Sequence, residues 1–140
     1  MKDIIIAKEI LQNNSYTITI VKNQKILKTS KQKGIRPMYE AITQIKDELK
    51  NASVADRVIG RAAAILLKYG EVKNLNTKII SKDALEILNN TNINVRYEKI
   101  VEFIKNRDKK DSCPVEKLSK DIEDPIILIS KIKAFLESIN

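Results

Sequence analysis

The spacing of hydrophobic and polar residues changes several times along the chain, and each change predicts a new structural element. Apolar residues at helical spacing predict a helix over residues 3–13. Strict alternation then predicts a strand over residues 16–21, which returns over residues 26–29 after a tight turn at Asn23 and Gln24. The chain is therefore expected to begin with a helix and a β-hairpin.

The middle of the chain predicts two helices. Pro37 suits the first turn of a helix. The apolar face of this helix would carry Tyr39, Ile42, Ile45 and Leu49. Residues 53–69 are apolar on nearly all sides and predict a second, buried helix that Gly70 closes. Ser53 and Asp56 have the spacing of a capping box at its start.

The second half alternates between strands and helices. The predicted elements are a strand over residues 72–80, a helix over 81–90, a strand over 93–98, a loop over 106–112, and helices that begin at Pro114 and Pro125. The last helix would carry Ile129, Ile132, Leu136 and Ile139 on one side. This order predicts one domain, residues 1–140, of the α/β class, in which a mixed sheet lies between helices in a three-layer α/β/α sandwich.

Composition limits the available chemistry. The 140 residues include no histidine and one cysteine, which excludes the usual zinc ligand sets and every histidine-dependent catalytic triad. We therefore expect no metal ion and no cofactor. No apolar run reaches the ~20 residues of a membrane span, and a single cysteine forms no internal disulfide. A cytoplasmic protein without membrane contact is the expectation.

The formal charge of +8 raises the question of a nucleic-acid partner. The lysines are spread along the whole chain, and aromatic residues make up only 4% of it, so a base-stacking surface is poorly supplied. We favour solvated surface charge over nucleic-acid binding.

Arginine is scarce, which makes its positions informative. Five of the 26 basic residues are arginines, namely Arg36, Arg57, Arg61, Arg96 and Arg107. Arginine offers a planar, bidentate donor to carboxylate or phosphate. Four of the five lie at predicted helix starts or in the 106–108 turn, where backbone N–H groups also attract anions. Structural salt bridges with Glu40, Asp56 or Asp108 are the alternative.

Asp56 has two explanations. It lies on the same side of the predicted helix as Gly60 and Ala64, whose small side chains would let a ligand approach. The capping box that it forms with Ser53 explains the same residue equally well.

Cys113 precedes Pro114 and so would cap a helix, a position that favours the reactive thiolate. Glu116 in the first turn adds negative charge that opposes this effect. Free cysteine is commonly a small buried hydrophobic residue, and we favour this structural interpretation of Cys113.

Three segments together resemble a small prokaryotic domain family of unknown function with a cytidine-deaminase-like fold. They are GIRPMYEA at 34–41, ADRVIGRAAAILLKYG at 55–70 and NRDKKDSCPVEKL at 106–118, and the resemblance spans nearly the whole chain. It implies a three-layer α/β/α sandwich. It does not imply deamination, because the predicted helix starts at Ser53 and Ser81 lack the His and Cys ligands that hold zinc in deaminases.

Ligands of such folds favour the carboxyl ends of strands, where the predicted helix starts would converge. The expected cleft residues are Asp56, Arg57, Ser81, Arg107, Asp108 and Cys113. The leading interpretation is a metal-free, deaminase-like domain that binds a small anionic ligand such as a nucleotide. Arg57, Arg61 and Arg107 would hold the anion, Asp56 and Asp108 would orient polar groups, and Ser81 and Cys113 would line the cleft.

Two alternatives stay open. The first is an enzyme in which Cys113 acts as the nucleophile, with a lysine or an aspartate such as Asp56 in place of the missing histidine. The second is an interaction domain whose apolar C-terminal helix, residues 126–139, docks on a partner or on a second copy of the chain. The second alternative would make the protein a homo-oligomer.

Overall fold

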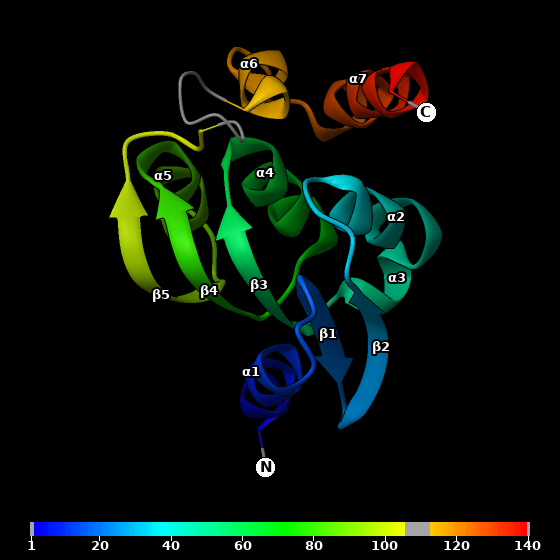
Figure 1. Ribbon diagram of the computed structural model, residues 1–140, viewed down its shortest axis with the longest axis vertical. Helices are drawn as coiled ribbons and strands as arrows, with labels where there is room; N and C mark the ends of the chain where they lie inside the picture. The colour runs from blue at the N-terminus through cyan, green and yellow to red at the C-terminus, as the bar shows by residue number, and fades with distance from the viewer. Residues whose placement is uncertain (1, 106–112, 140) are drawn as a thin grey trace.

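The computed structural model describes residues 2–105 and 113–139 (Figure 1). In this part of the chain the elements are α1 (Asp3–Asn13), β1 (Ile18–Lys22), β2 (Lys25–Ser30), α2 (Arg36–Gln44), α3 (Lys46–Leu49), β3 (Ser53–Ile59), α4 (Arg61–Gly70), β4 (Asn74–Ser81), α5 (Lys82–Asn89), β5 (Asn94–Val101), α6 (Pro114–Ser119) and α7 (Pro125–Ser138).

The strands form one mixed sheet in the order β2-β1-β3-β4-β5. β1 runs antiparallel to both β2 and β3, whereas β3, β4 and β5 run parallel to one another. The three parallel strands therefore begin together, at Ser53, Asn74 and Asn94, and end together at the opposite end of the sheet. The end where they begin is the amino end of the parallel strands, and the opposite end is their carboxyl end.

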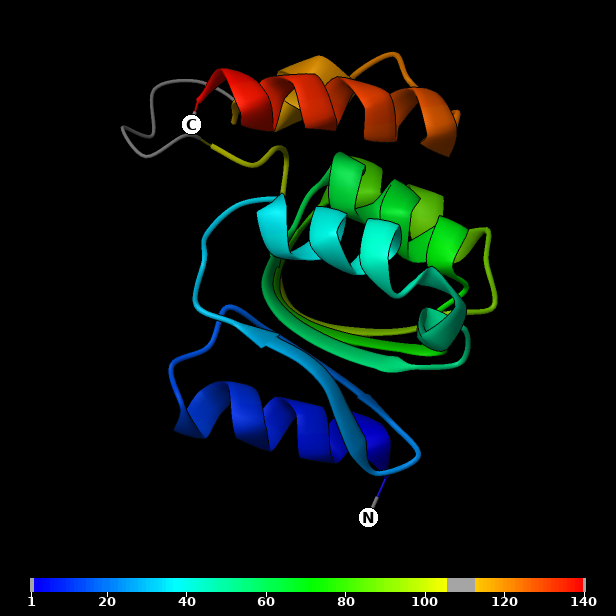
Figure 2. The same cartoon turned by 90° about the vertical axis from the view of Figure 1, so that its right-hand side faces the viewer.

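Helices cover both faces of the sheet (Figure 2). α1 packs on one face against β1 and β3, where Ala7, Leu11, Val21 and Ala55 form a small core. The other face carries the main core beneath α2 and α4, and α6 and α7 pack outside α4. The prediction of a mixed α/β sheet enclosed by helices is confirmed.

The prediction of one helix over residues 53–69 is wrong in its first half. Ser53–Ile59 is strand β3, and helix α4 begins only at Arg61. β3 is the central strand, paired with β1 and β4 and covered on both faces. Such a strand is apolar on both sides, and hydrophobic periodicity alone does not separate it from a buried helix. Ser53 and Asp56 therefore cap no helix.

Smaller differences concern helix ends. The helix predicted from Pro37 through Leu49 is interrupted at Ile45, which divides it into α2 and α3. Gly70 is the last residue of α4, and the left-handed residue that closes the helix is Glu71, with φ of 57°.

The buried residues of α7 are Leu128, Ile132 and Leu136. Ile139 is 60% exposed, so the expected apolar side of α7 is wrong at that residue.

Predictions that depend on a few neighbouring residues are confirmed. α1 spans Asp3–Asn13, the hairpin turns at Asn23 and Gln24 with left-handed backbone, and Pro114 opens α6. Asp124 caps α7 through its carboxylate, which accepts hydrogen bonds from the first backbone N–H groups of the helix. Across residues 2–105 and 113–139, none of the helices combines the length and the apolar character needed to cross a membrane.

Candidate functional site

The carboxyl end of the parallel strands, where the sequence predicts a ligand cleft, is closed at α4 by a side chain of the protein itself. The carboxylate of Glu116, from α6, accepts a hydrogen bond from the Arg61 backbone N–H at 3.1 Å. Burial raises the pKa of Glu116, although the N–H groups of Arg61 and Ala62 favour its charged form. A Cβ atom at Gly60 would overlap the Glu116 carboxylate, so this close approach requires glycine. Glu116 thus occupies the place that an anion would take at this helix start.

Arg61 is fully engaged within the protein. Its Nε donates to the Ser119 carbonyl at 2.8 Å, and its Nη2 donates to the Ile122 carbonyl at 2.7 Å. Its Nη1 pairs with the Asp83 carboxylate at 3.1 Å. Arg61 does line a recess of about 610 Å³ between α4, α5 and the start of α7. Because all three guanidinium nitrogens have protein acceptors, the arginine joins α4 to α5 and α6 without any ligand.

Arg57 and Ser81 are explained in the same way. Arg57 lies on the α1 face of the sheet, where its side chain donates to the carbonyls of Tyr16, at 2.6 Å, and Leu11, at 3.3 Å. Arg57 thereby supplies a hydrogen-bond donor to a backbone carbonyl in the last turn of α1. Ser81 caps α5, since its Oγ accepts a hydrogen bond from the Ala84 N–H at 3.2 Å. Arg57 and Arg61 contact helices on opposite faces of the sheet, so the expected convergence on one cleft is wrong for this pair.

Asp56 has the most unusual environment of the predicted residues. It lies in β3 opposite Ile18 of β1 and Thr77 of β4. Its Oδ1 accepts one long hydrogen bond, from the Val58 N–H at 3.4 Å. The residue keeps partial solvent exposure, yet burial of the carboxyl group raises its pKa to about 7, against the opposing effect of nearby N–H groups and of the Arg57 charge. A carboxyl group with this pKa is suited to proton transfer.

Asp56 should make the protein less stable as the pH rises. Its folded pKa of about 7 exceeds the ordinary value of 3.8, so between these values the folded state holds a proton that the unfolded state has lost. The free energy of unfolding should therefore fall from about pH 4 to about pH 7, and Asp56→Asn should remove roughly 2 kcal/mol of this fall. Urea unfolding across this range measures the effect, with the exposed Asp47→Asn of α3 as the control. Parallel pH profiles for wild type and Asp56→Asn would contradict the assignment.

Cys113 lies where the sequence places it, as the residue before the first turn of α6. Its backbone N–H donates to the Ile104 carbonyl at 2.8 Å, and its half-buried side chain packs against the main core. This packing favours the structural interpretation of the thiol. The other two predicted cleft residues, Arg107 and Asp108, lie outside the described residues.

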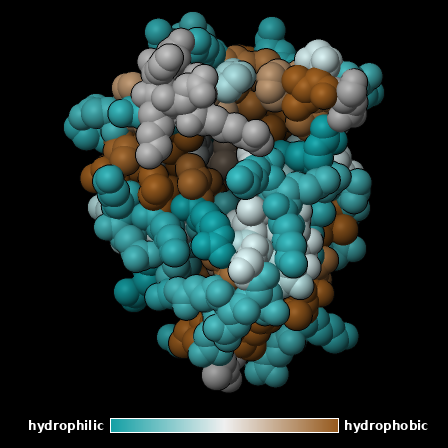
Figure 3. Space-filling view, viewed as in Figure 1, coloured by the Kyte–Doolittle hydropathy of each residue, from teal (hydrophilic) through white to brown (hydrophobic). Residues whose placement is uncertain are grey.

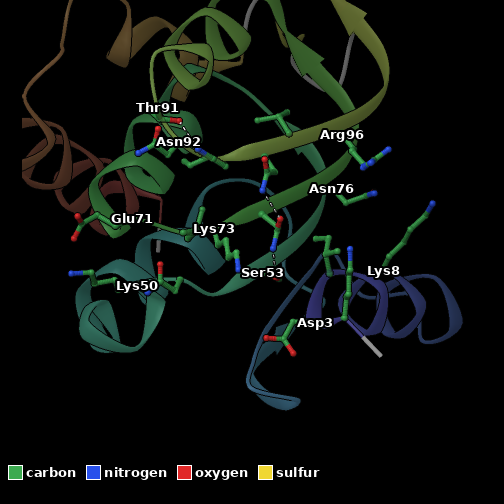
Figure 4. Close-up of a pocket in the computed structure, with 18 of the residues that line it drawn as sticks. Asp3, Lys8, Lys50, Ser53, Glu71, Lys73, Asn76, Thr91, Asn92 and Arg96 are labelled. Atoms are coloured by element: carbon green, nitrogen blue, oxygen red, sulfur yellow. Dashed lines mark hydrogen bonds between the residues drawn. The ribbon is translucent and has the colours of Figure 1, made fainter.

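A second region, which the sequence did not predict, is a groove of about 1860 Å³ at the amino end of the parallel strands (Figure 4). Its floor is a row of polar side chains: Asn94 Nδ2 donates to Asn74 Oδ1 at 3.2 Å, and Asn74 Nδ2 donates to Ser53 Oγ at 3.0 Å. Backbone hydrogen bonds join the same segments, from Lys73 N–H to the Ala52 carbonyl at 2.8 Å and from Asn94 N–H to the Lys73 carbonyl at 2.9 Å. The floor is therefore fixed by the sheet.

One wall of the groove is formed by the start of α1 and the hairpin turn. The Asp3 carboxylate accepts hydrogen bonds from the N–H groups of Asn23, at 2.8 Å, and Gln24, at 2.9 Å. Both turn residues have positive φ, 52° and 67°, a conformation that leaves these N–H groups pointing the same way. Asp3 and Glu71 are the acidic residues of the lining, and the charge of Asp3 is directed at the turn.

Cations outnumber acidic residues in the lining of the groove. The cations are Lys2, Lys8, Lys50, Lys68, Lys73 and Arg96. Within residues 2–105 and 113–139 none of them forms an ion pair. Figure 4 shows Lys8, Asn76 and Arg96 toward one end of the groove and Lys50 with Glu71 toward the other. The groove thus gathers positive charge that the protein itself leaves uncompensated.

The sequence holds a weak signal for this groove. Lys50-Asn51 and Lys73-Asn74 are two of the four Lys-Asn pairs in the sequence; Asn51 lies two residues before β3, and Asn74 is the first residue of β4. Parallel strands begin at one end of a sheet, so repeated Lys-Asn pairs before successive strands bring lysine and amide groups together. The misassigned helix over residues 53–69 hid this pattern, because it removed β3 from the predicted set of parallel strands.

Comparison with known proteins identifies the family and the fold. Residues 6–136 match a family described as a domain of unknown function, DUF1893. The structure is similar to the crystal structure of a DUF1893 family protein (TM1506) from Thermotoga maritima, with a TM-score of 0.86 and 26% sequence identity, over 96% of this chain and 90% of that chain. No curated protein matches the sequence. The predicted resemblance to a family of unknown function is confirmed.

Proposed function

We propose that this chain, which belongs to the DUF1893 family, binds a small anionic ligand such as a nucleotide in the groove at the amino end of β3, β4 and β5. The main support is the set of unpaired cations above a floor of side-chain amides. Ammonium groups attract phosphate, and amides both donate and accept hydrogen bonds, as the polar edge of a base requires. A nucleotide combines these two chemistries in one molecule.

Lys50 and Lys73 are the best-placed phosphate ligands. Lys50 lies three residues before β3 and Lys73 directly before β4, on segments that the Asn51 N–H joins by a hydrogen bond to the Glu71 carbonyl at 2.9 Å. The fixed backbone reduces the ordering that binding would otherwise require. Asn76 suits the base, because its side chain has no hydrogen-bond partner in the described part of the chain and lies along the same lining.

This location differs from the carboxyl end that the sequence favoured. There the polar atoms of Arg57, Arg61 and Ser81 are bonded within the chain, and the Glu116 carboxylate would repel an anion at α4. Asp56 lines neither this groove nor the recess beside Arg61, so its raised pKa bears on the stability of the fold rather than on the ligand site.

We also propose that the fold is cytidine-deaminase-like and that the domain does not deaminate. The mixed sheet with helices on both faces supports the fold, as the sequence resemblance implies. Deaminases hold their zinc with His and Cys ligands. A chain with no histidine and a single cysteine does not supply that set.

Thermal unfolding in the presence of ATP tests the groove. ATP should raise the unfolding midpoint of the wild-type protein, because it stabilises the state that binds it. The double variant Lys50→Gln/Lys73→Gln should bind ATP at least about tenfold more weakly, since two charge-assisted contacts are lost. Lys131→Gln/Lys133→Gln removes the same charge from exposed positions of α7 and should leave binding unchanged. Isothermal titration measures the affinities.

The choice of probes separates charge from base recognition. Inorganic triphosphate should bind more weakly than ATP but show the same dependence on Lys50 and Lys73, whereas adenosine lacks the charge and should bind weakly. Equal losses in both lysine pairs would show that only the overall charge matters. No stabilisation by ATP, GTP, CTP or triphosphate in the wild-type protein would end the proposal.

A further inference from the structure

β5 is the outermost strand of the sheet on the side away from the hairpin. Among the described residues it pairs only with β4, so one row of its backbone N–H and C=O groups has no strand beside it (Figure 1). Six of its eight residues are exposed. Tyr97 and Ile100 are 44% and 40% exposed, and Figure 3 shows apolar side chains gathered over the carboxyl ends of β3, β4 and β5. An open edge with apolar side chains readily accepts another strand.

The charges along β5 are complementary to those of a second β5 in the opposite direction. In an antiparallel pair centred on Tyr97, residues equally far from Tyr97 lie opposite each other. Arg96 of each chain then faces Glu98 of the other, on the same face of the sheet. Both residues are exposed, and neither forms an ion pair within residues 2–105 and 113–139.

We propose that β5 pairs with β5 of a second copy of this chain, antiparallel and centred on Tyr97, so that two five-stranded sheets join into one continuous sheet. Two Arg96–Glu98 ion pairs flank a Tyr97–Tyr97 contact. Ile100 lies opposite Asn94, at the outer ends of the paired segment. This two-fold arrangement uses the same surface on both copies and closes at the dimer.

The order of charges along β5 favours a second copy of this chain as the partner, and antiparallel over parallel pairing. Parallel pairing in the same register would place Arg96 beside Arg96, which is unfavourable. β2, the other outer strand, carries Lys25 and Lys28 and no acidic residue, so it lacks the complementary charge that would attract its own copy. The association does not depend on the nucleotide site, although Arg96 also lines the groove.

Charge reversal tests the register directly. Sedimentation velocity without nucleotide should show a dimer of the wild-type protein that dissociates on dilution. Arg96→Glu and Glu98→Arg should each weaken it about tenfold or more, because each places two like-charged pairs across the interface. Mixing these two variants in equal amounts should restore a dimer, and so should Arg96→Glu/Glu98→Arg in one chain. Lys133→Glu, an exposed charge reversal on α7, is the control and should dimerise as the wild type does.

Each alternative result overturns the proposal. A wild-type protein that is monomeric at every concentration up to its solubility limit would exclude the dimer. Normal dimerisation of the single reversal variants would exclude this register. A mixture of the two variants that stays monomeric, although circular dichroism shows both to be folded, would exclude it too. Ile126 of α7 is 58% exposed, and a dimer lost in Ile126→Asp but kept in both reversals would place the second copy on α7 instead.

Discussion

Replacing Arg61 with alanine should lower the free energy of unfolding by about 3 kcal/mol, a large change for a residue on the rim of the core. The Arg61 side chain is only 11% exposed, and it satisfies the Ser119 and Ile122 carbonyls as well as the Asp83 carboxylate. Its loss removes the side-chain donor of the Ile122 carbonyl, leaves the Ser119 carbonyl with the Ile122 N–H alone, and weakens the attachment of α6 to α4. Urea unfolding monitored by circular dichroism measures the change, and faster hydrogen exchange in α6 would locate it.

Two further variants separate geometry from charge. Arg61→Lys keeps the charge but loses the fork that reaches three acceptors, so its stability should fall between those of wild type and Arg61→Ala. Lys82→Ala also breaks an ion pair, with Glu102, but the two side chains are 59% and 73% exposed. Such a surface pair adds little, and this variant should resemble the wild type. An Arg61→Ala protein as stable as Lys82→Ala would show that the contacts of Arg61 do not support the fold.

The elements that the sequence predicts well are those encoded by neighbouring residues. The hairpin follows from strict alternation before Asn23 and Gln24, residues that tolerate the left-handed backbone seen there, and from the short strand after them. The starts of α6 and α7 follow from Pro114 and Pro125, each in the first turn of its helix. No distant contact is needed to specify these features.

β3 was misassigned because its apolar character comes from the tertiary structure. Its residues are covered by α1 on one face and by the main core on the other, so both sides of the strand are apolar. One local signal argued against a helix, namely Gly60 in the middle of the predicted segment. The change from strand to helix occurs there, with β3 ending at Ile59 and α4 beginning at Arg61.

This boundary also explains why the predicted arginine cluster does not form. Arg57 and Arg61 were expected to hold one anion together, because both would lie near the start of a single predicted helix. In the structure Arg57 belongs to a strand and contacts the end of α1, whereas Arg61 belongs to a helix and contacts α6. The scarcity of arginine did identify residues that need a bidentate donor. Their acceptors are carbonyl groups and a carboxylate of the chain itself.

The groove was beyond local prediction for a different reason. Its lining comes from α1, the hairpin turn and the segments before β3, β4 and β5, which meet only because the parallel strands begin at one end of the sheet. Each contributing segment, such as Lys50-Asn51 or Asn90–Asn94, is a polar turn when considered alone. The charge distribution likewise shows no dense basic block along the sequence, because the fold rather than the sequence order gathers these lysines.

Gly60→Ala should lower the free energy of unfolding by about 2 kcal/mol, because the added methyl group would displace the half-buried Glu116 carboxylate from its hydrogen bond with the Arg61 N–H. The backbone is not the obstacle, since Gly60 has φ of −104° and ψ of −172°, which any residue adopts. Thermal and urea unfolding measure the change. Gly34→Ala is the matched control: Gly34 has φ of 77° and no heavy atom within 4 Å of an added Cβ, so its cost is conformational and independent of Glu116.

The Glu116→Ala background distinguishes steric overlap from a general intolerance of Gly60. Glu116→Ala alone should cost about 1 kcal/mol, because the Arg61 N–H at the start of α4 loses its acceptor. In that background Gly60→Ala should cost less than about 1 kcal/mol, which gives a coupling energy of at least about 1 kcal/mol. Gly34→Ala should cost the same in both backgrounds. Equal losses of stability from Gly60→Ala with and without Glu116 would contradict this contact. The Glu116 carboxylate would then not hold α6 to the carboxyl end of the sheet, and the start of α4 would be open to an external anion.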